Sequence, residues 1–261
     1  MSDTPSQVSR LLSIMATLRD PDRGCEWDRA QTFDTIVPHT IEEAYEVADA
    51  IARGDATEIR DELGDLLFQV VFQSRIAQEN GLFDFEDVAG SIADKLEARH
   101  PHIFGSDAAP SDELDAKWES LKAAEREAKG LGSSMDGVAL ALPALMRAQK
   151  LQKRAARDGF DWPDRAGPEG KIIEEMQELR EASSEQILDE CGDFLFAAVN
   201  LVRSYGIDAE EALRHGNAKF ERRYRAMESI APEAFAMLEL EAQEALWQAV
   251  KAVEKSQTKA G

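Results

Sequence analysis

Residues 62–76 read ELGDLLFQVVFQSRI, and this stretch decides the fold. Its apolar residues cover most of the circumference of a helix, which is typical of a helix buried among other helices. The polar exceptions Glu62, Asp65, Gln69 and Gln73 form one narrow stripe at spacings of three and four. The stretch therefore predicts a helical core in which two carboxylates stand at the mouth of an apolar groove.

The acidic pattern of the first half of the chain returns in the second half. Glu42-Glu43-Ala44-Tyr45-Glu46 is repeated as Glu174-Glu175-Met176-Gln177-Glu178, and Glu62-Leu63-Gly64-Asp65 is repeated as Glu190-Cys191-Gly192-Asp193. The flanking repeats are Gly24 to Asp28 with Gly159 to Trp162, Lys95 and Arg99 with Lys219 and Arg223, and Trp118 and Lys122 with Trp247 and Lys251. The interval is about half the chain, which indicates two tandem copies of one module rather than a short-period solenoid. We expect the copies to span residues 1–130 and 135–261.

The spacing of apolar residues predicts an all-α chain. They recur mostly at intervals of three and four, and no alternating segment of strand length is bounded by turn residues. The fold class expected is two tandem modules that resemble four-helix bundles. The predicted helices are 8–18, 40–52 with Thr40 as the N-cap, 57–80, 84–99 and 112–129, then 142–158, 171–182, 185–205, 209–229 and 232–255. Residues 130–134 are the predicted linker.

The charge of the chain argues against two classes of partner. The formal net charge is -21, whereas nucleic acid and anionic membranes attract basic surfaces. No run approaches the roughly 20 apolar residues that span a bilayer, and residues 1–10 lack the features of a signal peptide. We therefore expect a cytoplasmic protein that binds neither nucleic acid nor membrane, with Cys25 and Cys191 as ordinary reduced thiols.

The repeated acids are the best candidate for a metal site. Glu-Glu-x-x-Glu alone is typical of a solvated helix face. The neighbouring apolar helix changes this interpretation, because ionised carboxylates in apolar surroundings cost several kcal/mol each unless they are neutralised. Arg or Lys partners, protonation or a metal ion could neutralise them. Four carboxylates from two antiparallel helices would form an oxygen-only site that favours Mg²⁺ or Mn²⁺ over zinc. A di-iron bundle would need Glu-x-x-His pairs, which the repeat lacks.

Cationic and aromatic residues follow the acids in both copies. Lys95 with Arg99, and Lys219 with Arg223, lie four apart on one helix face, where they could bind phosphate or pair with neighbouring glutamates. Their recurrence favours phosphate. Trp118 and Trp247 each precede a lysine by four residues, and both base stacking and core packing remain open for them. Lys171 has no basic counterpart in the first copy, so the second copy is better equipped to hold a polyphosphate.

Together, Gly-Cys-x-Trp-Asp, Glu-Glu-x-x-Glu and Glu-x-Gly-Asp-Leu-Leu-Phe within two helical copies resemble the MazG family of nucleoside triphosphate pyrophosphohydrolases. The resemblance covers about residues 6–255. It implies Mg²⁺-dependent hydrolysis of nucleoside triphosphates to nucleoside monophosphate and pyrophosphate. It also implies an all-α fold related to dimeric dUTPases, and assembly into a homodimer or higher homo-oligomer.

The resemblance assigns roles to the matching residues. The implied metal ligands are Glu43, Glu46, Glu62 and Asp65 in the first copy, and Glu175, Glu178, Glu190 and Asp193 in the second. The resemblance also implies triphosphate contacts for Lys219 and Arg223, with Lys171 nearby, and a base-side contact for Trp247. The internal repeat adds Lys251 and the first-copy residues Lys95, Arg99 and Trp118 as candidate substrate contacts. Glu42 and Glu174, one helical step from the ligands, are candidates to orient or deprotonate the attacking water.

Two other functions fit the same sequence. A catalytically silent helical module would bind nucleotides or a partner protein and release no product. In a mixed version, the first copy would be regulatory or structural and only the second would hydrolyse, because duplicated sites are free to diverge.

Overall fold

The computed structural model describes residues 6–104, 130, 132–231 and 235–258. Within these ranges the ordered elements are helices and no strand is present, which confirms the predicted all-α class. The chain divides into two compact units, Met1–Leu121 and Lys122–Gly261. The helices that the structure describes do not include one long and apolar enough to cross a membrane.

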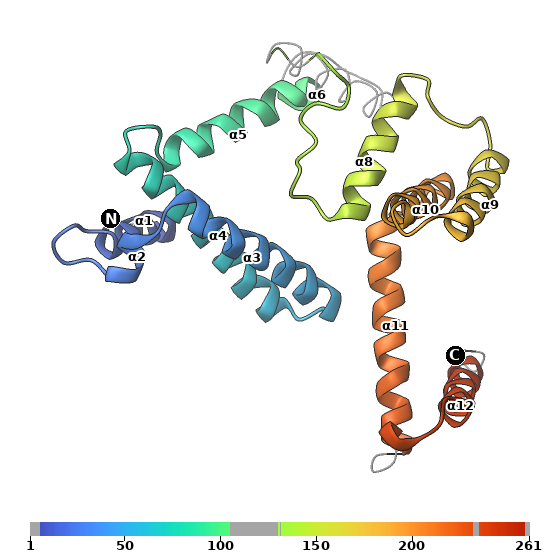
Figure 1. Cartoon of the computed structure of the whole chain (residues 1–261). Coiled ribbons are helices and arrows are strands. Elements are labelled where there is room, and N and C mark those ends of the chain that lie inside the picture. Colours follow the sequence, from blue (N-terminus) through green and yellow to red (C-terminus); the bar gives the residue numbers. More distant parts are fainter. Residues whose placement is uncertain (1–5, 105–129, 131, 232–234, 259–261) are drawn as a thin grey trace. The chain divides into compact units, whose positions relative to one another are not determined.

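The first unit is built around a long pair of helices. Its elements are α1 (Gln7–Leu18), α2 (Glu26–Ala30), α3 (Phe33–Arg53), α4 (Ala56–Glu79), α5 (Phe85–Arg99) and α6 (Pro101–Phe104). Helices α3 and α4 lie side by side, α1 packs on α4, and α5 contacts α4 as well (Figure 1). The core between them is formed by Met15, Ile36, Val71, Phe72 and Ile76, all at most 3% exposed.

A tight turn sets the pairing of α3 with α4. Gly54 ends α3 with φ 78°, a left-handed conformation that glycine adopts without a steric penalty. The next residue, Asp55, caps α4, because its Oδ1 accepts hydrogen bonds from the backbone N–H of Thr57 (2.8 Å) and Glu58 (3.3 Å). The chain reverses within these two residues, so the acids near the end of α3 face the acids near the start of α4.

Helix α3 begins earlier than predicted. Thr40 is not the N-cap; the cap is Thr32, which exchanges hydrogen bonds with Thr35 in a capping box. The side chain of Thr40 instead donates to the Ile36 carbonyl within the helix at 3.2 Å. Pro38 removes one backbone donor from this early part of the helix. The cap and the burial of Ile36 in the core outweigh that loss.

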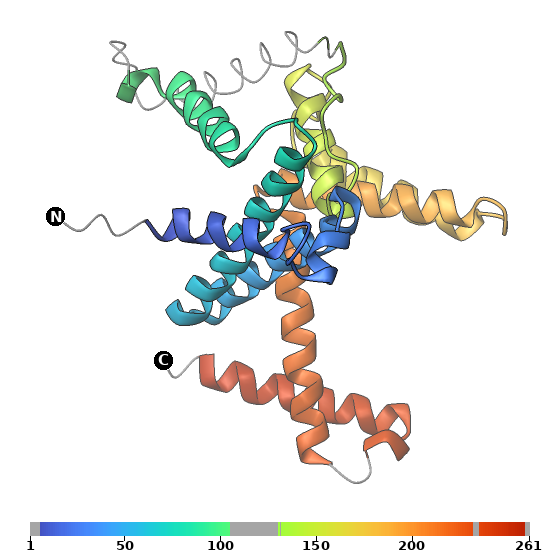
Figure 2. The same ribbon diagram turned by 90° about the vertical axis from the view of Figure 1, so that its left-hand side faces the viewer.

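The second unit also contains a pair of long helices, and further helices follow the pair. Its elements are α8 (Ala144–Arg157), α9 (Ala166–Glu181), α10 (Ile187–Ser204), α11 (Ala209–Ile230), the 3₁₀ helix η2 (Phe235–Met237) and α12 (Leu240–Thr258). Helix α9 pairs with α10, and α8 packs on α10 and α11. Helix α12 packs against α11 (Figure 2). Met227 of α11, Phe235 of η2 and Val250 of α12 form the buried cluster between them.

Two helices of the second unit begin at other residues than predicted. Helix α9 begins at Ala166 rather than Lys171, so the loop before it is shorter than expected. The last helix begins at Leu240 rather than residue 232, because a 3₁₀ turn at Phe235–Met237 intervenes. The helix predicted over 112–129 lies outside the described residues.

The prediction that residues 62–76 are buried on all sides is correct for only part of α4. Val71, Phe72 and Ile76 are buried, but Leu63 is 49% exposed and Leu67 38% exposed. The equivalent part of α10 is also open, with Leu195 56% and Phe196 44% exposed. These apolar surfaces lie next to the acids, and the described elements of the same unit leave them partly exposed.

Candidate metal centre and adjoining cavity

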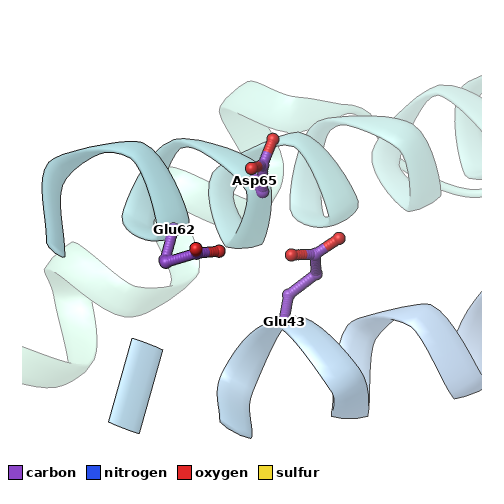
Figure 3. A group of neighbouring side chains, drawn as sticks. All are labelled: Glu43, Glu62 and Asp65. Atoms are coloured by element: carbon purple, nitrogen blue, oxygen red, sulfur yellow. The ribbon is translucent and has the colours of Figure 1, made fainter. Parts of the chain in front are cut away.

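Three carboxylates of the first unit face one another across the α3–α4 pair. Glu43 comes from α3, and Glu62 and Asp65 come from one face of α4, since they are three residues apart. One oxygen from each lies within 4.8 Å of the others, and Figure 3 shows the three side chains around a common space. Three of the four predicted first-copy ligands are thus brought together.

Burial and mutual repulsion raise the pKa of two carboxylates in this group. Burial, reinforced by the charges of Asp65 and Glu46, raises the pKa of Glu43 above its ordinary value, although a hydrogen bond from Gln69 opposes this. Burial and the charges of Glu46 and Asp65 likewise raise the pKa of Glu62. Glu46, the fourth predicted ligand, is therefore close enough to act on both carboxylates. The charge of Arg53 opposes the rise at Glu62 but does not reverse it.

The second unit forms the corresponding group from α9 and α10. One oxygen each of Glu175, Glu190 and Asp193 lies within 4.8 Å of the others. Glu175 is only 4% exposed, and its Oε2 has no hydrogen-bond partner among the described residues. Glu178 forms an overlapping group with Glu174 and Glu175, and burial together with the charge of Glu175 raises the pKa of Glu178.

Lys171 distinguishes the second group from the first. Its Nζ lies 2.6 Å from Glu175 Oε1 and 2.7 Å from Glu174 Oε1. Hydrogen bonds to these carboxylates, Glu174 first, raise the pKa of Lys171, so the ammonium stays protonated. In the first copy the position is taken by His39, whose Nδ1 is 3.7 Å from Glu42 Oε2. Glu42 is not among the three carboxylates that converge there.

The second-copy residues fit a hard divalent cation. An ion bound at roughly 2.0–2.6 Å from each ligand oxygen holds those oxygens about 4–5 Å apart or closer, which matches the observed group. The donors are all carboxylate oxygens, the type that Mg²⁺, Mn²⁺ and Ca²⁺ prefer. The buried Glu175 Oε2 lacks a partner that such an ion would supply. The spacing and type of these donors therefore suit a divalent cation.

A cavity of about 830 Å³ adjoins this group. Lys171, Glu175 and Asp193 line it on one side. The rest of its wall is largely apolar and aromatic and includes Phe160, Trp162, Phe196, Ala197, Gln152, Asn200 and Arg203. This volume lies within the roughly 300–1,000 Å³ of small-molecule sites.

The loop that carries Phe160 and Trp162 is fixed to α10 by an ion pair. Arg203 donates to both carboxylate oxygens of Asp161, at 2.6 and 3.0 Å. These hydrogen bonds hold the pKa of Asp161 below its ordinary value. Sequence reasoning did not single out Asp161 or Arg203 as functional. The only available signal was that Asp161 belongs to the repeated motif at 159–162.

The other predicted substrate contacts lie elsewhere. Arg223 on α11 donates to Glu254 Oε2 of α12 at 2.8 Å, and its guanidinium lies 5.4 Å from the ring centroid of Trp247. None of Lys219, Arg223, Trp247 and Lys251 lines the 830 Å³ cavity. In the first unit, Lys95 lines a separate hollow of about 380 Å³ on α5, and Arg99 lies one turn further along that helix. Trp118 lies outside the described residues.

Comparison with known proteins relates both halves of the chain to nucleotide pyrophosphohydrolases. Residues 31–104 match the family described as MazG nucleotide pyrophosphohydrolase domain, and residues 145–219 match phosphoribosyl-ATP pyrophosphohydrolase. The nucleoside triphosphate pyrophosphohydrolase of Escherichia coli K12 is 51% identical over 256 residues, which cover 94% of this chain and 97% of that protein. The nucleoside triphosphate pyrophosphohydrolase/pyrophosphatase MazG of Thermotoga maritima is 41% identical over 240 residues and 92% of each chain.

Proposed function

The chain belongs to the MazG family of nucleoside triphosphate pyrophosphohydrolases, and from this premise we propose that its second copy is the main active centre. The reaction proposed is hydrolysis of a nucleoside triphosphate to nucleoside monophosphate and pyrophosphate. The observation that carries the assignment is the continuity of the Glu175, Glu190 and Asp193 group with a cavity large enough for a nucleotide.

The metal proposed is Mg²⁺, with Mn²⁺ as a substitute. Glu175, Glu190 and Asp193 would hold it, with Glu178 as a further ligand. The ion supplies a bound water of lowered pKa and neutralises phosphate charge. We propose the equivalent role for Glu43, Glu46, Glu62 and Asp65 in the first copy, where His39 stands at the position of Lys171.

The remaining steps fall to residues around the ion. Glu174, next to the ligands, is proposed to accept the proton of the attacking water as the bond between the α- and β-phosphates breaks and pyrophosphate leaves. Lys171 has three ammonium donors, and two carboxylates already orient it, so its third donor can meet a phosphate oxygen.

Assembly is part of the proposal. The exposed apolar side chains of α4 and α10 support a homodimer or higher homo-oligomer, because such patches on a monomer usually mark contact surfaces. A role for Lys219, Arg223, Trp247 and Lys251 in holding substrate requires an assembly in which α11 and α12 approach a cavity. We further propose a cytoplasmic protein with domains at 1–130 and 135–261 that binds no nucleic acid.

The test asks which product is released and which of the two copies of the module releases it. The protein is incubated with each nucleoside triphosphate and Mg²⁺, and pyrophosphate and free phosphate are measured separately. Glu175→Gln and Asp193→Asn should abolish pyrophosphate release while leaving the fold intact, and the matched first-copy variants Glu43→Gln and Asp65→Asn should retain most of it. Normal turnover in both second-copy variants would exclude the second copy as the active centre. Nucleotide binding without any product would instead support a silent binding module.

A further inference from the structure

The two copies differ at two positions that follow the shared acids at helical spacing. Helices α4 and α10 align without a gap from Glu62 and Glu190 onward. Four residues after Asp65 the first copy has Gln69, where the second has Ala197; seven residues after Asp65 it has Phe72, where the second has Asn200. Residues at spacings of four and seven share a helix face. Both differences therefore lie on the face that carries the aspartate.

In the first unit, side chains fill the space beside the acids. Phe72 is fully buried, and Trp27 packs edge-on against it with ring centroids 6.4 Å apart. Phe68 packs on Phe72 in the same way at 5.7 Å. Gln69 is 5% exposed and its Nε2 donates to Glu43 Oε1 at 3.4 Å. The face beside the first-copy acids is thus a packed core.

In the second unit, the corresponding face borders the 830 Å³ cavity. Ala197 and Asn200 both line it, together with Glu175 and Asp193 from the acidic group. The smaller side chains at these two positions leave room where Gln69 and Phe72 pack in the first copy. A ligand that reaches the acids with its phosphates can therefore place its remaining part against Asn200.

The hydrogen bonds of Asn200 fix what it offers to a ligand. Its Oδ1 accepts from Arg203 Nε at 3.1 Å and from Nη2 at 2.6 Å. A guanidinium can only donate, so the amide must turn its oxygen to Arg203 and its NH₂ group away. Arg203 is itself held by Asp161. The amide nitrogen of Asn200 is consequently left as an oriented donor at the cavity wall, next to the aromatic side chain of Phe196 on the same helix.

We propose that Asn200 is a specificity-determining residue of the second copy, whose amide nitrogen donates to a carbonyl oxygen or ring nitrogen of the substrate's nucleobase. Phe72 excludes the base from the equivalent place in the first copy. The aromatic side chains Phe160, Trp162 and Phe196 suit a flat base, for which stacking on aromatic rings is favourable. This inference rests on the proposed function, because the acids and the cavity are assigned to one nucleotide.

The test distinguishes recognition of the nucleobase from binding of the phosphates. Asn200→Asp keeps the shape and can still accept from Arg203, but it removes the NH₂ donor. We expect KM to rise about 10- to 100-fold for nucleotides whose base uses this donor, in line with an unpaired buried polar group at a binding site. The effect should differ among ATP, GTP, CTP and UTP. Inhibition by inorganic tripolyphosphate, which has no base, and Mn²⁺ binding followed by electron paramagnetic resonance should stay within about twofold, as ordinary scatter among independent sites.

Two further variants complete the design. Gln7→Glu makes an equivalent amide-to-carboxylate change at an exposed position of α1, in the first unit, and should alter none of these quantities. Asn200→Phe should weaken nucleotide binding in equilibrium dialysis while tripolyphosphate still binds; circular dichroism checks that it folds. An Asn200→Asp enzyme with unchanged KM for all four nucleotides, or with tripolyphosphate inhibition weakened equally, would overturn the inference. If the unmodified protein releases no pyrophosphate, the proposed function fails, and dialysis with the four nucleotides still decides whether Asn200 recognises a base.

Discussion

Replacing Lys171 with methionine tests how the buried carboxylate of Glu175 is stabilised. Methionine keeps an unbranched side chain of similar length and a similar helix propensity, so the change removes mainly the charge. Lys171 contacts Glu175 Oε1 at 2.6 Å, and the other oxygen of Glu175 has no partner in the part of the chain that the structure describes. In the metal-free protein the variant therefore leaves a nearly buried carboxylate without its cation.

The expected cost lies between two limits. Breaking a fully buried ion pair costs about 3–5 kcal/mol, whereas an exposed pair contributes about 0–1 kcal/mol. The Glu175 side chain is 5% exposed but that of Lys171 is 38% exposed, so solvent screens one partner. We expect a loss of about 1–3 kcal/mol in the free energy of unfolding. For a unit of this size that corresponds to a Tm lower by roughly 3–10 °C.

Calorimetry in EDTA and in Mg²⁺ measures the Tm of the metal-free protein and of the protein with the ion. With EDTA, Lys171→Met should melt below the unmodified protein, and Lys171→Arg should restore most of the loss. With saturating Mg²⁺ the gap should narrow, because the ion replaces the missing positive charge and no ammonium competes with it. Lys153→Met, on an exposed face of α8, is the matched control.

Either of two results would refute this reasoning. Lys171→Met could prove as stable in EDTA as Lys153→Met, which would mean that solvent alone stabilises the Glu175 carboxylate. Alternatively, Mg²⁺ could raise the Tm of the variant no more than that of the unmodified protein, in which case Lys171 and the ion do not share a partner.

Three further predictions concern stability. Arg203→Met should lower the free energy of unfolding at neutral pH, because Arg203 holds the pKa of Asp161 below 3.8. The difference in this free energy between the variant and the unmodified protein should be constant above about pH 5 and shrink as the pH falls below 3.8. Unfolding measured across an acid titration checks this. Gly54→Ala should lower the free energy of unfolding, measured in urea, by about 1 kcal/mol, because φ at this residue is 78°. Gly90→Ala should raise it by about 0.5–1 kcal/mol, because this residue lies inside a helix with open space where a methyl group would stand. Arg19→Met should cost roughly 2–4 kcal/mol in the same assay, since this buried guanidinium donates to a carboxylate and two backbone carbonyls; a loss below 0.5 kcal/mol would contradict it.

The helical class and the convergence of the acids could be predicted because both follow from local spacing. Glu62 and Asp65 share a face whatever surrounds them, and Gly54 with Asp55 signals the turn that brings α3 back along α4. The start of α3 could not be placed by the same means. The sequence pattern predicted Thr40 as the cap, whereas the burial of Ile36 against residues from other helices favours a helix that begins after Thr32.

The cavity shows why the rest of the site escaped sequence analysis. Its walls depend on a contact between Asp161 and Arg203, which are 42 residues apart, and on the small size of Ala197 relative to Gln69. Residue spacing reveals neither the Asp161–Arg203 contact, which is tertiary, nor the empty space beside Ala197, which arises because its side chain is small. The repeat drew attention to residues that the copies share, whereas the space of the cavity arises where they differ. In this duplicated chain, the shared acids therefore carry the proposed chemistry, and the proposed base site rests on the positions that differ on the same helix face.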